Sequence, residues 1–438
     1  MNQRIYKIFL WLSLAFALAF LSFWIMGFNQ LLGPFLILFF ICLAIGVRTS
    51  EFFKSFSYTI TIFAAVSLAM FYPNLFTTWG DFELKILIVP LLQVIMFGMG
   101  SQMSLQDFKG VAKMPTGVFV GIVCQFTIMP VIGFVIASTF GFAPEVAAGI
   151  ILIGSSPSGL ASNVMSFIAK ANLALSVTLT AVATLLAPFM TPFLMQWLAG
   201  EFVPVDFWAM MLSIINMIIL PIVAGLMFNA IAYGRETKKS IIWQGVAYFI
   251  IILITNYILF SQTETDLGGA INGLLANAFW FLLLPIVAGY LFFKLAKGRK
   301  EYLDQVLAFV SMAGIAIIIV IITAAGRNDL LQIGFLLILA SLIHNLSGYG
   351  LGYGICKLLR MDEKSCRTIA LEVGMQNGGL ASGIAVSMGK IATVGLAPAV
   401  FGPLMNITGS SLATWWRGRP AGDVEKVRPG EVEDKVEV

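Results

Sequence analysis

Apolar residues run along this chain in long segments that are separated by short polar connections. A helix needs about 20 such residues to cross the hydrocarbon of a bilayer. The pattern predicts fourteen membrane-spanning helices, near 8–28, 31–47, 56–73, 84–100, 115–139, 145–169, 173–199, 207–231, 241–262, 275–296, 303–325, 330–356, 365–389 and 393–416. The first segment is longer than a typical signal-peptide core, and a second follows at once, so we expect it to be retained as a span.

With this count of spans, almost all basic residues fall in the connections on one side of the membrane. With the N-terminus in the cytoplasm, all but three of the 26 Lys and Arg residues lie inside, the exceptions being Lys85, Arg327 and Lys390. A wrong count would scramble this positive-inside pattern in the second half of the chain. We therefore predict an all-α polytopic membrane protein with both ends inside and a charged cytoplasmic tail at 418–438.

The composition supports a membrane protein and argues against several other classes. Hydrophobic residues make up 59% of the chain and charged residues 11%, too few for the surface of a soluble protein of this size. The net charge of +4 is explained by the excess of Lys and Arg on the cytoplasmic side. We therefore expect lipid and no nucleic acid as a partner. No phosphate-binding loop, metal cluster or nucleophile–base arrangement is present in the sequence, which predicts neither an enzyme nor a cofactor.

One acidic residue stands in the middle of a predicted span. Glu372 is the only charged side chain between Thr368 and Met388. A carboxylate at this depth costs roughly 2.5–3.5 kcal/mol on insertion scales unless it is compensated. We therefore interpret Glu372 as part of a functional site and expect a bound cation or a proton as the compensation.

A short repeat connects this region with the first half of the chain. Gly159-Leu-Ala-Ser-Asn163 recurs as Gly379-Leu-Ala-Ser-Gly383, and the same shift of 220 residues places Gln125 opposite Asn345. Halves of seven spans each must insert in opposite senses, which predicts an inverted repeat. The halves would be 1–200 and 201–417, with core parts at about 115–199 and 330–416.

Both copies of the repeat lie where a continuous helix is least favoured. Pro157 interrupts the first, and glycines at 374, 378 and 379 surround the second. Helices that break within a membrane are tolerated where their free backbone groups line a cavity or meet an ion. Close packing of small residues is the alternative, but it does not explain the Glu, Gln and Asn residues at the same depth. A weaker echo, Leu220–Gly225 against Leu284–Gly289, indicates a local duplication.

The side chains near these breaks offer oxygen atoms to a hard cation. Such cations take oxygen ligands, and Na⁺ is expected to take about five or six. Ser176 and Thr180 lie one helical turn apart on one face, although each hydroxyl can instead bond to a carbonyl of its own helix. The other candidates are Gln125, Ser162, Asn163, Glu372 and Gln376.

At these residues the chain resembles the bile acid:sodium symporter family. The resemblance rests on Glu372-Val-Gly-Met-Gln-Asn377, Ala161-Ser-Asn-Val-Met165 and Ala174-Leu-Ser-Val-Thr-Leu-Thr180, supported by Gln125–Pro130, His344-Asn345 and Asn406–Ser410. It covers about 49–230 and 285–416. It implies a core domain crossed by two broken helices and a separate panel domain, here with four helices beyond the ten of the family.

The resemblance also implies two sodium sites that share one carboxylate. The first would be formed by Ser162, Asn163, Ser176, Thr180 and Glu372. The second would be formed by Gln125, Glu372, Gln376 and the backbone carbonyls of Val373 and Met375. The implied substrate cavity lies between core and panel and includes Leu160, Asn163, Asn377 and Asn406.

The function implied is a Na⁺-coupled symporter of an organic anion that works by alternating access. The anion would be bile-acid-like or a small carboxylate such as pantoate, and the membrane the bacterial cytoplasmic one. Leu160 departs from the family, because relatives often have a small or hydroxylated residue there, and Met405 stands where some have His. Together with the extra helices, these departures leave the substrate, the stoichiometry and the oligomeric state open.

Two other functions remain as alternatives. One is a proton-coupled or uncoupled carrier of organic anions in which Glu372 cycles a proton. The other is a membrane sensor that does not transport. Elsewhere, we interpret His344 as a packing residue rather than a proton relay, and Trp415-Trp416-Arg417 as an interfacial anchor.

Overall fold

The computed structural model describes residues 3–50, 53–103, 110–233, 236–262, 267–296 and 300–421. Within these ranges the regular secondary structure consists of helices and one short hairpin. The predicted tail from residue 422 onward lies outside the described residues, as do Lys109, Arg235, Lys297 and Arg299 of the topology argument.

Ten helical segments in the described ranges are long and apolar enough to span a membrane. They match ten of the fourteen predicted spans, and the chain is therefore a polytopic membrane protein. They comprise α1 (Gln3–Ile25), α2 (Asn29–Gly46), α4 (Ile88–Gln102), α6 (Pro115–Thr139), α9 (Leu173–Leu194), α10 (Phe207–Ile214) with α11 (Leu220–Ala232), α12 (Lys238–Gln262), α13 (Leu267–Ala278) with α14 (Leu284–Ala296), α15 (Lys300–Ala325) and α16 (Arg327–Leu358).

The other four predicted spans are helical too, but two of them are divided. The segments at 56–73 and 393–416 become α3 (Ser57–Phe71) and α19 (Leu396–Arg417). The segment at 145–169 consists of α7 (Pro144–Ser155) and α8 (Leu160–Ile168), and that at 365–389 consists of α17 (Glu363–Gly374) and α18 (Gly378–Ser387). Both interruptions fall on the Pro157 and Gly374–Gly379 stretches at which the sequence disfavours a helix.

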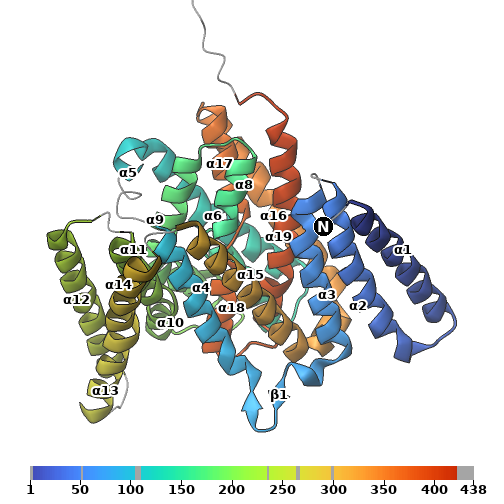
Figure 1. Cartoon of the computed structure of the whole chain (residues 1–438), viewed down its shortest axis with the longest axis horizontal. Helices are drawn as coiled ribbons and strands as arrows, with labels where there is room; N and C mark the ends of the chain where they lie inside the picture. Colours follow the sequence, from blue (N-terminus) through green and yellow to red (C-terminus); the bar gives the residue numbers. More distant parts are fainter. Residues whose placement is uncertain are drawn as a thin grey trace, which may run out of the picture.

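A small hairpin that the helical pattern does not predict joins α3 to α4. Its strands, β1 (Thr78–Trp79) and β2 (Phe82–Glu83), pair antiparallel around a two-residue turn. Gly80 in this turn has a φ of +60°, which a glycine adopts without strain. The hairpin projects from the end of the molecule opposite the C-terminal end of α19 (Figure 1).

The two copies of Leu-Pro-Ile-Val-Ala-Gly share an irregular backbone. A π turn (Ile215–Ile219) precedes the first copy and another (Phe279–Leu283) precedes the second, at the same offset of 64 residues. The proline of each motif has no N–H to continue the regular hydrogen-bond pattern, which favours such a turn. The shared irregularity strengthens the hypothesis that these segments arose by duplication.

Glycines allow α4 and α11 to cross in direct backbone contact. A Cβ on Gly100 would collide with the backbone of Ile222, and one on Gly225 would collide with that of Phe97. The Asn229 amide also donates to the carbonyl of Ser101 at 2.6 Å. Close approach of this kind is a usual role of glycine between membrane helices, and it makes α4 and α11 one packed unit.

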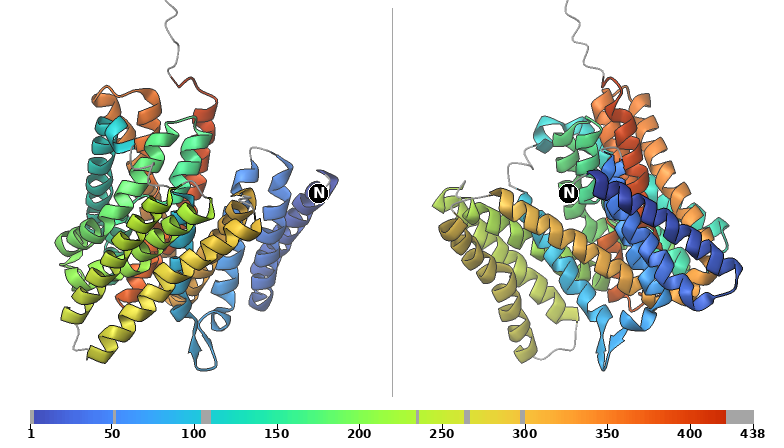
Figure 2. Two further views of the ribbon diagram at one scale, coloured as in Figure 1. Left: turned by 60° about the vertical axis from the view of Figure 1, so that its left-hand side comes forward. Right: turned by 45° about the vertical axis from the view of Figure 1, so that its right-hand side comes forward.

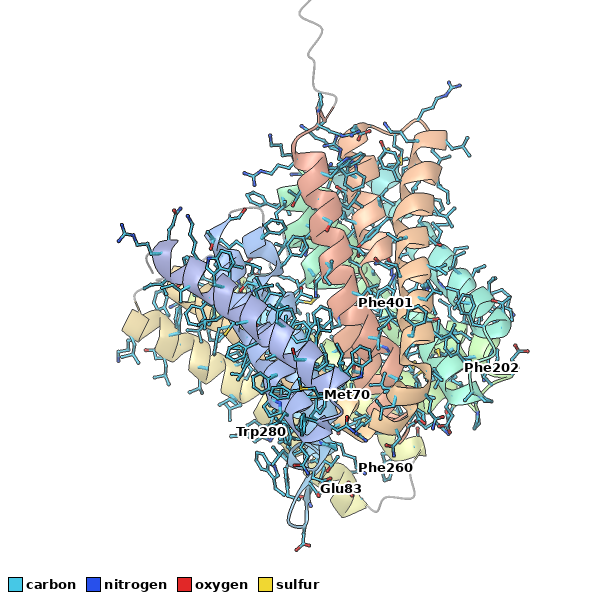
Figure 3. All side chains as sticks on the ribbon, turned by 90° about the vertical axis from the view of Figure 1, so that its right-hand side faces the viewer. Met70, Glu83, Phe202, Phe260, Trp280 and Phe401 are labelled. Atoms are coloured by element: carbon cyan, nitrogen blue, oxygen red, sulfur yellow. The ribbon has the colours of Figure 1, made fainter. Side chains whose placement is uncertain are left out.

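The helices are arranged in three groups (Figures 1 and 2). Helices α1–α3 stand at one side and α12–α14 at the other, while α6–α9 and α16–α19 form a separate bundle. Helix α4 packs against α11, α15 and α18, and therefore lies between the outer groups and that bundle. Phe401 of α19 lies inside the bundle, fully buried, whereas Glu83 lies at the hairpin (Figure 3).

Candidate functional site

The two helix breaks cross and pair with each other. The Gly159 N–H donates to the carbonyl of Met375 at 3.0 Å, and the Asn377 N–H donates to the carbonyl of Pro157 at 2.8 Å. Ser158 and Gln376 thereby face each other as an antiparallel bridge. Each break thus satisfies backbone groups that the other leaves free, which the interior of a membrane requires.

Glu372 lies beside this crossing, in the last turn of α17. It is 2% exposed. Its Oε1 accepts hydrogen bonds from Ser162 Oγ at 2.6 Å and Ser176 Oγ at 2.5 Å, and its Oε2 accepts one from Thr180 Oγ1 at 2.9 Å. No Lys, Arg or His in the described part of the chain forms an ion pair with it.

Asn163 completes this group of side chains. Its Oδ1 accepts from Ser176 Oγ at 2.8 Å and from Thr180 Oγ1 at 3.1 Å. The five residues predicted for the first sodium site therefore form one hydrogen-bonded cluster, contributed by α8, α9 and α17. All its ligand-capable atoms are oxygens, and the cluster contains one ionisable carboxyl group.

The residues predicted for the second sodium site form a neighbouring amide cluster. Gln125 Nε2 donates to Gln376 Oε1 at 2.7 Å, and Gln376 Nε2 donates to the Val373 carbonyl at 2.6 Å. Gln125 Oε1 is buried and has no hydrogen-bond donor among the described residues. The Met375 carbonyl already accepts the Gly159 N–H of the crossing. The cluster offers carbonyl oxygens, which are suitable ligands for Na⁺.

Asn345 has a role that the sequence did not reveal. Its Nδ2 donates to the carbonyl of Gly374, where α17 ends, at 2.7 Å, and its Oδ1 accepts from Thr408 Oγ1 at 2.5 Å. Gln125 does the same for the other break, since its Nε2 donates to the Ser156 carbonyl just after α7 at 3.0 Å. Gln125 and Asn345 occupy equivalent positions in the repeat, 220 residues apart. This equivalence was the sequence signal that could have predicted a donor to the second break.

Asn345→Ala is expected to lower the stability of the protein by roughly 1–3 kcal/mol, because it leaves the buried Gly374 carbonyl without a donor. The measurement is thermal unfolding of the purified protein in detergent. Asn406→Ala is the matched control, because that amide bonds only to Gly402 of its own helix in the structure. Equal losses in both variants would contradict the assigned role.

The residues predicted for the substrate cavity lie on three helices around the crossing. Leu160 and Asn163 are half-buried in the first turn of α8, and Asn406 is half-buried on α19. Asn377 is buried and caps α18, its Oδ1 accepting from the Leu380 N–H at 3.0 Å. Helices α8 and α18 both contact α19.

His344 is packed within the bundle. Its side chain is fully buried, its Nε2 lies 2.8 Å from the Met129 carbonyl, and its ring meets that of Phe401 edge to face. These contacts are those expected of a packing residue and link α16 to α6 and α19.

A buried arginine that the sequence analysis counted only as a cytoplasmic charge ties three helices together. Arg367 in α17 is 2% exposed and pairs with Glu363 at 2.8 Å. Its guanidinium also donates, at 2.7–3.4 Å, to the carbonyls of Ala169, Trp416, Arg419 and Pro420. The ends of α8 and α19 are therefore fixed to α17.

Of the two tryptophans in the predicted interfacial anchor, only Trp415 is exposed. Trp415 is 52% exposed and lies against the guanidinium of Arg419. Trp416 is 5% exposed and stacks on Tyr353, with Arg367 above its ring. The burial of Trp416 follows from long-range packing, which a local pattern of aromatic residues does not report.

A second polar connection lies at the end of the bundle opposite Arg367. Glu145 at the start of α7 pairs with Lys390, just after α18, and accepts from Thr393 Oγ1 at 2.5 Å. Arg367 connects α17 to the end of α8 in the corresponding way. The paired breaks therefore lie between two polar connections, one at each end of the bundle.

A polytopic helical protein whose two broken helices cross beside a buried carboxylate has the architecture of an ion-coupled secondary transporter. Residues 89–268 match the family described as the Sodium Bile acid symporter family. The "Uncharacterized sodium-dependent transporter YocS" of Bacillus subtilis is 32% identical over 371 residues, 84% of this chain and 94% of that protein.

Plant and animal proteins are also similar to the chain. The "Probable sodium/metabolite cotransporter BASS1, chloroplastic" of Arabidopsis thaliana is 28% identical over 326 residues, 74% of this chain and 65% of that protein. The ileal sodium/bile acid cotransporter of Oryctolagus cuniculus is 26% identical over 306 residues, 69% of each chain. The chain belongs to the sodium bile acid symporter family, and it is a membrane transporter rather than an enzyme.

Proposed function

We propose that this protein is a Na⁺-coupled symporter of an organic anion that works by alternating access. The observation that carries the proposal is the cluster around Glu372. Three hydroxyl groups converge on its buried carboxylate from two helices, within 2.5–2.9 Å, directly beside the crossing of the breaks. The relatives named as sodium-dependent or as sodium cotransporters support the choice of ion.

The chemistry of the cluster suits a monovalent hard cation. A buried carboxylate without a basic partner is costly, and a bound cation would remove this cost. Hydroxyl and amide oxygens are ligands of hard cations, whereas soft metals prefer thiolate and imidazole. On this proposal the hydroxyls of Ser162, Ser176 and Thr180, which donate to Glu372 in the structure, direct their lone pairs toward the ion, and the charge of Glu372 is neutralised.

We propose two Na⁺ sites that share Glu372. The first uses Ser162, Asn163, Ser176, Thr180 and Glu372. The second uses Gln125, Glu372, Gln376 and the carbonyls of Val373 and Met375. Gln125 Oε1 supports the second site. It is buried and accepts no hydrogen bond from the described residues, so its lone pairs are available to a cation.

The anion is proposed to bind on the panel side of the crossing. Helices α8 and α18 begin there, and helix N-termini favour negative groups through their free N–H groups. Leu160, Asn163, Asn377 and Asn406 would line this region. The names of the plant and rabbit relatives support a metabolite or bile-acid-like anion, and a small carboxylate such as pantoate is our other candidate.

The architecture proposed for this mechanism is fourteen spans with both ends in the cytoplasm, in two inverted repeats at 1–200 and 201–417. It is supported by the offset of about 220 residues between α7 and α17 and between α8 and α18. The equivalent amides Gln125 and Asn345 support it as well. Core parts at 115–199 and 330–416 would then rock against a panel, in a bacterial cytoplasmic membrane.

In the proposed mechanism, ion binding prepares the site for the anion. Na⁺ at Glu372 would hold α8, α9 and α17 together, because the three elements contribute to one coordination shell. This would fix the crossing and the N-termini of α8 and α18, which form the wall of the anion site. The two polar connections at Arg367 and Glu145 would let the core move as one body.

Uptake of a labelled organic acid into proteoliposomes is expected to rise with external Na⁺ with a Hill coefficient above one, because two ions bind per cycle. Gln125→Ala is expected to reduce the coefficient toward one by removing the second site. Uptake that follows a pH gradient in K⁺ medium without Na⁺ would favour the proton-coupled carrier. Na⁺-stabilised protein without flux of any acid would favour the sensor.

A further inference from the structure

Ser158 has a buried hydroxyl group that the two proposed sodium sites do not include. The residue is 1% exposed and lies in the first break, between the end of α7 and the start of α8. Its Oγ has no hydrogen-bond partner among the described residues. A buried polar atom without a partner costs free energy. Ser158 is therefore expected to meet a ligand that is not part of the protein.

The backbone at this position explains why the hydroxyl group lacks a partner within the chain. A serine in a membrane helix usually bonds to a carbonyl one turn earlier, and Ser156, directly after α7, does so with Leu152 at 2.8 Å. Ser158 follows Pro157 and lies outside both helices. No helical turn precedes it, so this common partner of a buried serine is missing.

The pairing of the two breaks places the Ser158 side chain beside the amide cluster. Ser158 and Gln376 lie opposite each other in the antiparallel bridge. The backbone hydrogen bonds of the crossing flank this pair and do not join it. Opposite residues of such a pair project to the same face, and their side chains come closer than in a hydrogen-bonded pair. Because Gln376 bonds to Gln125, Ser158 lies next to residues of the second proposed site.

The chemistry around the hydroxyl group favours a cation as its ligand. Ser158 interacts with the carboxyl group of Glu372, although not with the geometry of a hydrogen bond. No basic side chain in the described part of the chain pairs with that carboxyl group. Gln125 Oε1 is also buried without a hydrogen-bond donor. Two such oxygens beside one carboxyl group suit a hard cation.

We propose that Ser158 is a further ligand of the second Na⁺ site, where its hydroxyl oxygen contacts the ion held by Gln125 and Glu372. The other ligands of that site, Gln376 among them, come from α6 and the second break. Ser158 adds a ligand from the first break, so that one ion connects both breaks at their crossing. This inference rests on the proposed function, because it requires Na⁺ at Glu372.

The test is the dependence of the unfolding temperature of the purified full-length protein on NaCl, with KCl added to keep the ionic strength constant. In Ser158→Ala, half-maximal stabilisation is expected to need about tenfold more NaCl or above, the effect of losing one polar contact to a charge. In KCl alone, this variant should be at least as stable as the wild type, because it no longer buries an unpaired hydroxyl group. Lower stability in KCl with an unchanged NaCl dependence would show a structural role and overturn the proposal.

Two further variants control for the loss of the side chain. Ser382→Ala is the matched control, because Ser382 is also buried but bonds to the Gly378 carbonyl of its own helix at 2.7 Å. It should keep the NaCl dependence of the wild type. Ser158→Cys keeps the size of the side chain but replaces a hard oxygen with a soft sulfur. It should lose affinity for Na⁺ as Ser158→Ala does, and it provides the measurement if the alanine variant folds poorly.

A double variant tests the assignment to the second site. In a Gln125→Ala background, Ser158→Ala is expected to add little, because both oxygens belong to one site. Fully additive losses would contradict this assignment. If Na⁺ stabilises the wild type and both Ser158 variants equally, this inference is wrong and the proposed function stands. If Na⁺ does not stabilise the wild type, the proposed function is wrong as well.

Discussion

Glu372→Gln is expected to abolish the stabilisation of the purified protein by Na⁺ and, with it, Na⁺-driven uptake. In the wild type, a ligand at 100 times its dissociation constant stabilises the folded state by about 2.7 kcal/mol. The amide of glutamine cannot neutralise a cation, so this gain should disappear. Without Na⁺, the variant should be at least as stable as the wild type, because a neutral amide costs less to bury than a charge.

The measurement is the unfolding temperature in NaCl and in KCl at one pH, together with uptake into proteoliposomes. Glu201→Gln is the control, because Glu201 is exposed and its loss changes the net charge by the same amount. It should keep the full Na⁺ response. Undiminished stabilisation by Na⁺ in Glu372→Gln would mean that the ion binds elsewhere.

Arg367→Met is expected to destabilise the protein by about 2–6 kcal/mol, because the buried carbonyls of Ala169 and Trp416 each lose their donor at roughly 1–3 kcal/mol. Glu363 loses one of its two basic partners and keeps Lys357, while the carbonyls at the ends of α8 and α19 lose their donor. Amide hydrogen exchange should therefore accelerate in the last turn of α19. The Na⁺ response should persist, because Glu372 keeps its own hydrogen-bond partners.

The matched control for this change is Arg417→Met. Arg417 is the last residue of α19, the helix whose end Arg367 holds. Arg417 is exposed, so the change in stability should stay within about 0.5 kcal/mol. Arg367→Lys should fall between the two, because lysine keeps the charge but cannot reach several carbonyls at once. A stability of Arg367→Met equal to that of Arg417→Met would show that the connection contributes little.

The sequence was sufficient to locate most of the helices and the centre of the site. Apolar length alone marked the ten helical segments of the described residues that are long enough to span, because the bilayer imposes that length on each helix. Glu372 stood out as the one charge in its span, and Pro157 marked a break that the structure contains. Each of these signals lies within a single segment of the chain, so it can be recognised from one sequence.

The contacts between distant segments could not be predicted in this way. Arg367 stood next to other cytoplasmic charges and looked solvated, but carbonyls 49 to 53 residues further along the chain bury it. Thr408 had no local feature that linked it to Asn345, 63 residues away. The hairpin at Thr78–Glu83 follows from its Gly80-Asp81 turn, a signal that apolar periodicity does not contain.

The pairing of the two breaks has a consequence for how the protein is made. The Pro157 carbonyl and the Gly159 N–H pair with Asn377 and Met375, which are synthesised about 220 residues later. At roughly 5–20 residues per second, this interval lasts about 10–45 s. During that time the first half lies in the membrane with polar backbone groups exposed, so it depends on water or on the insertion machinery until the second half arrives. Neither half is expected to fold when it is produced alone.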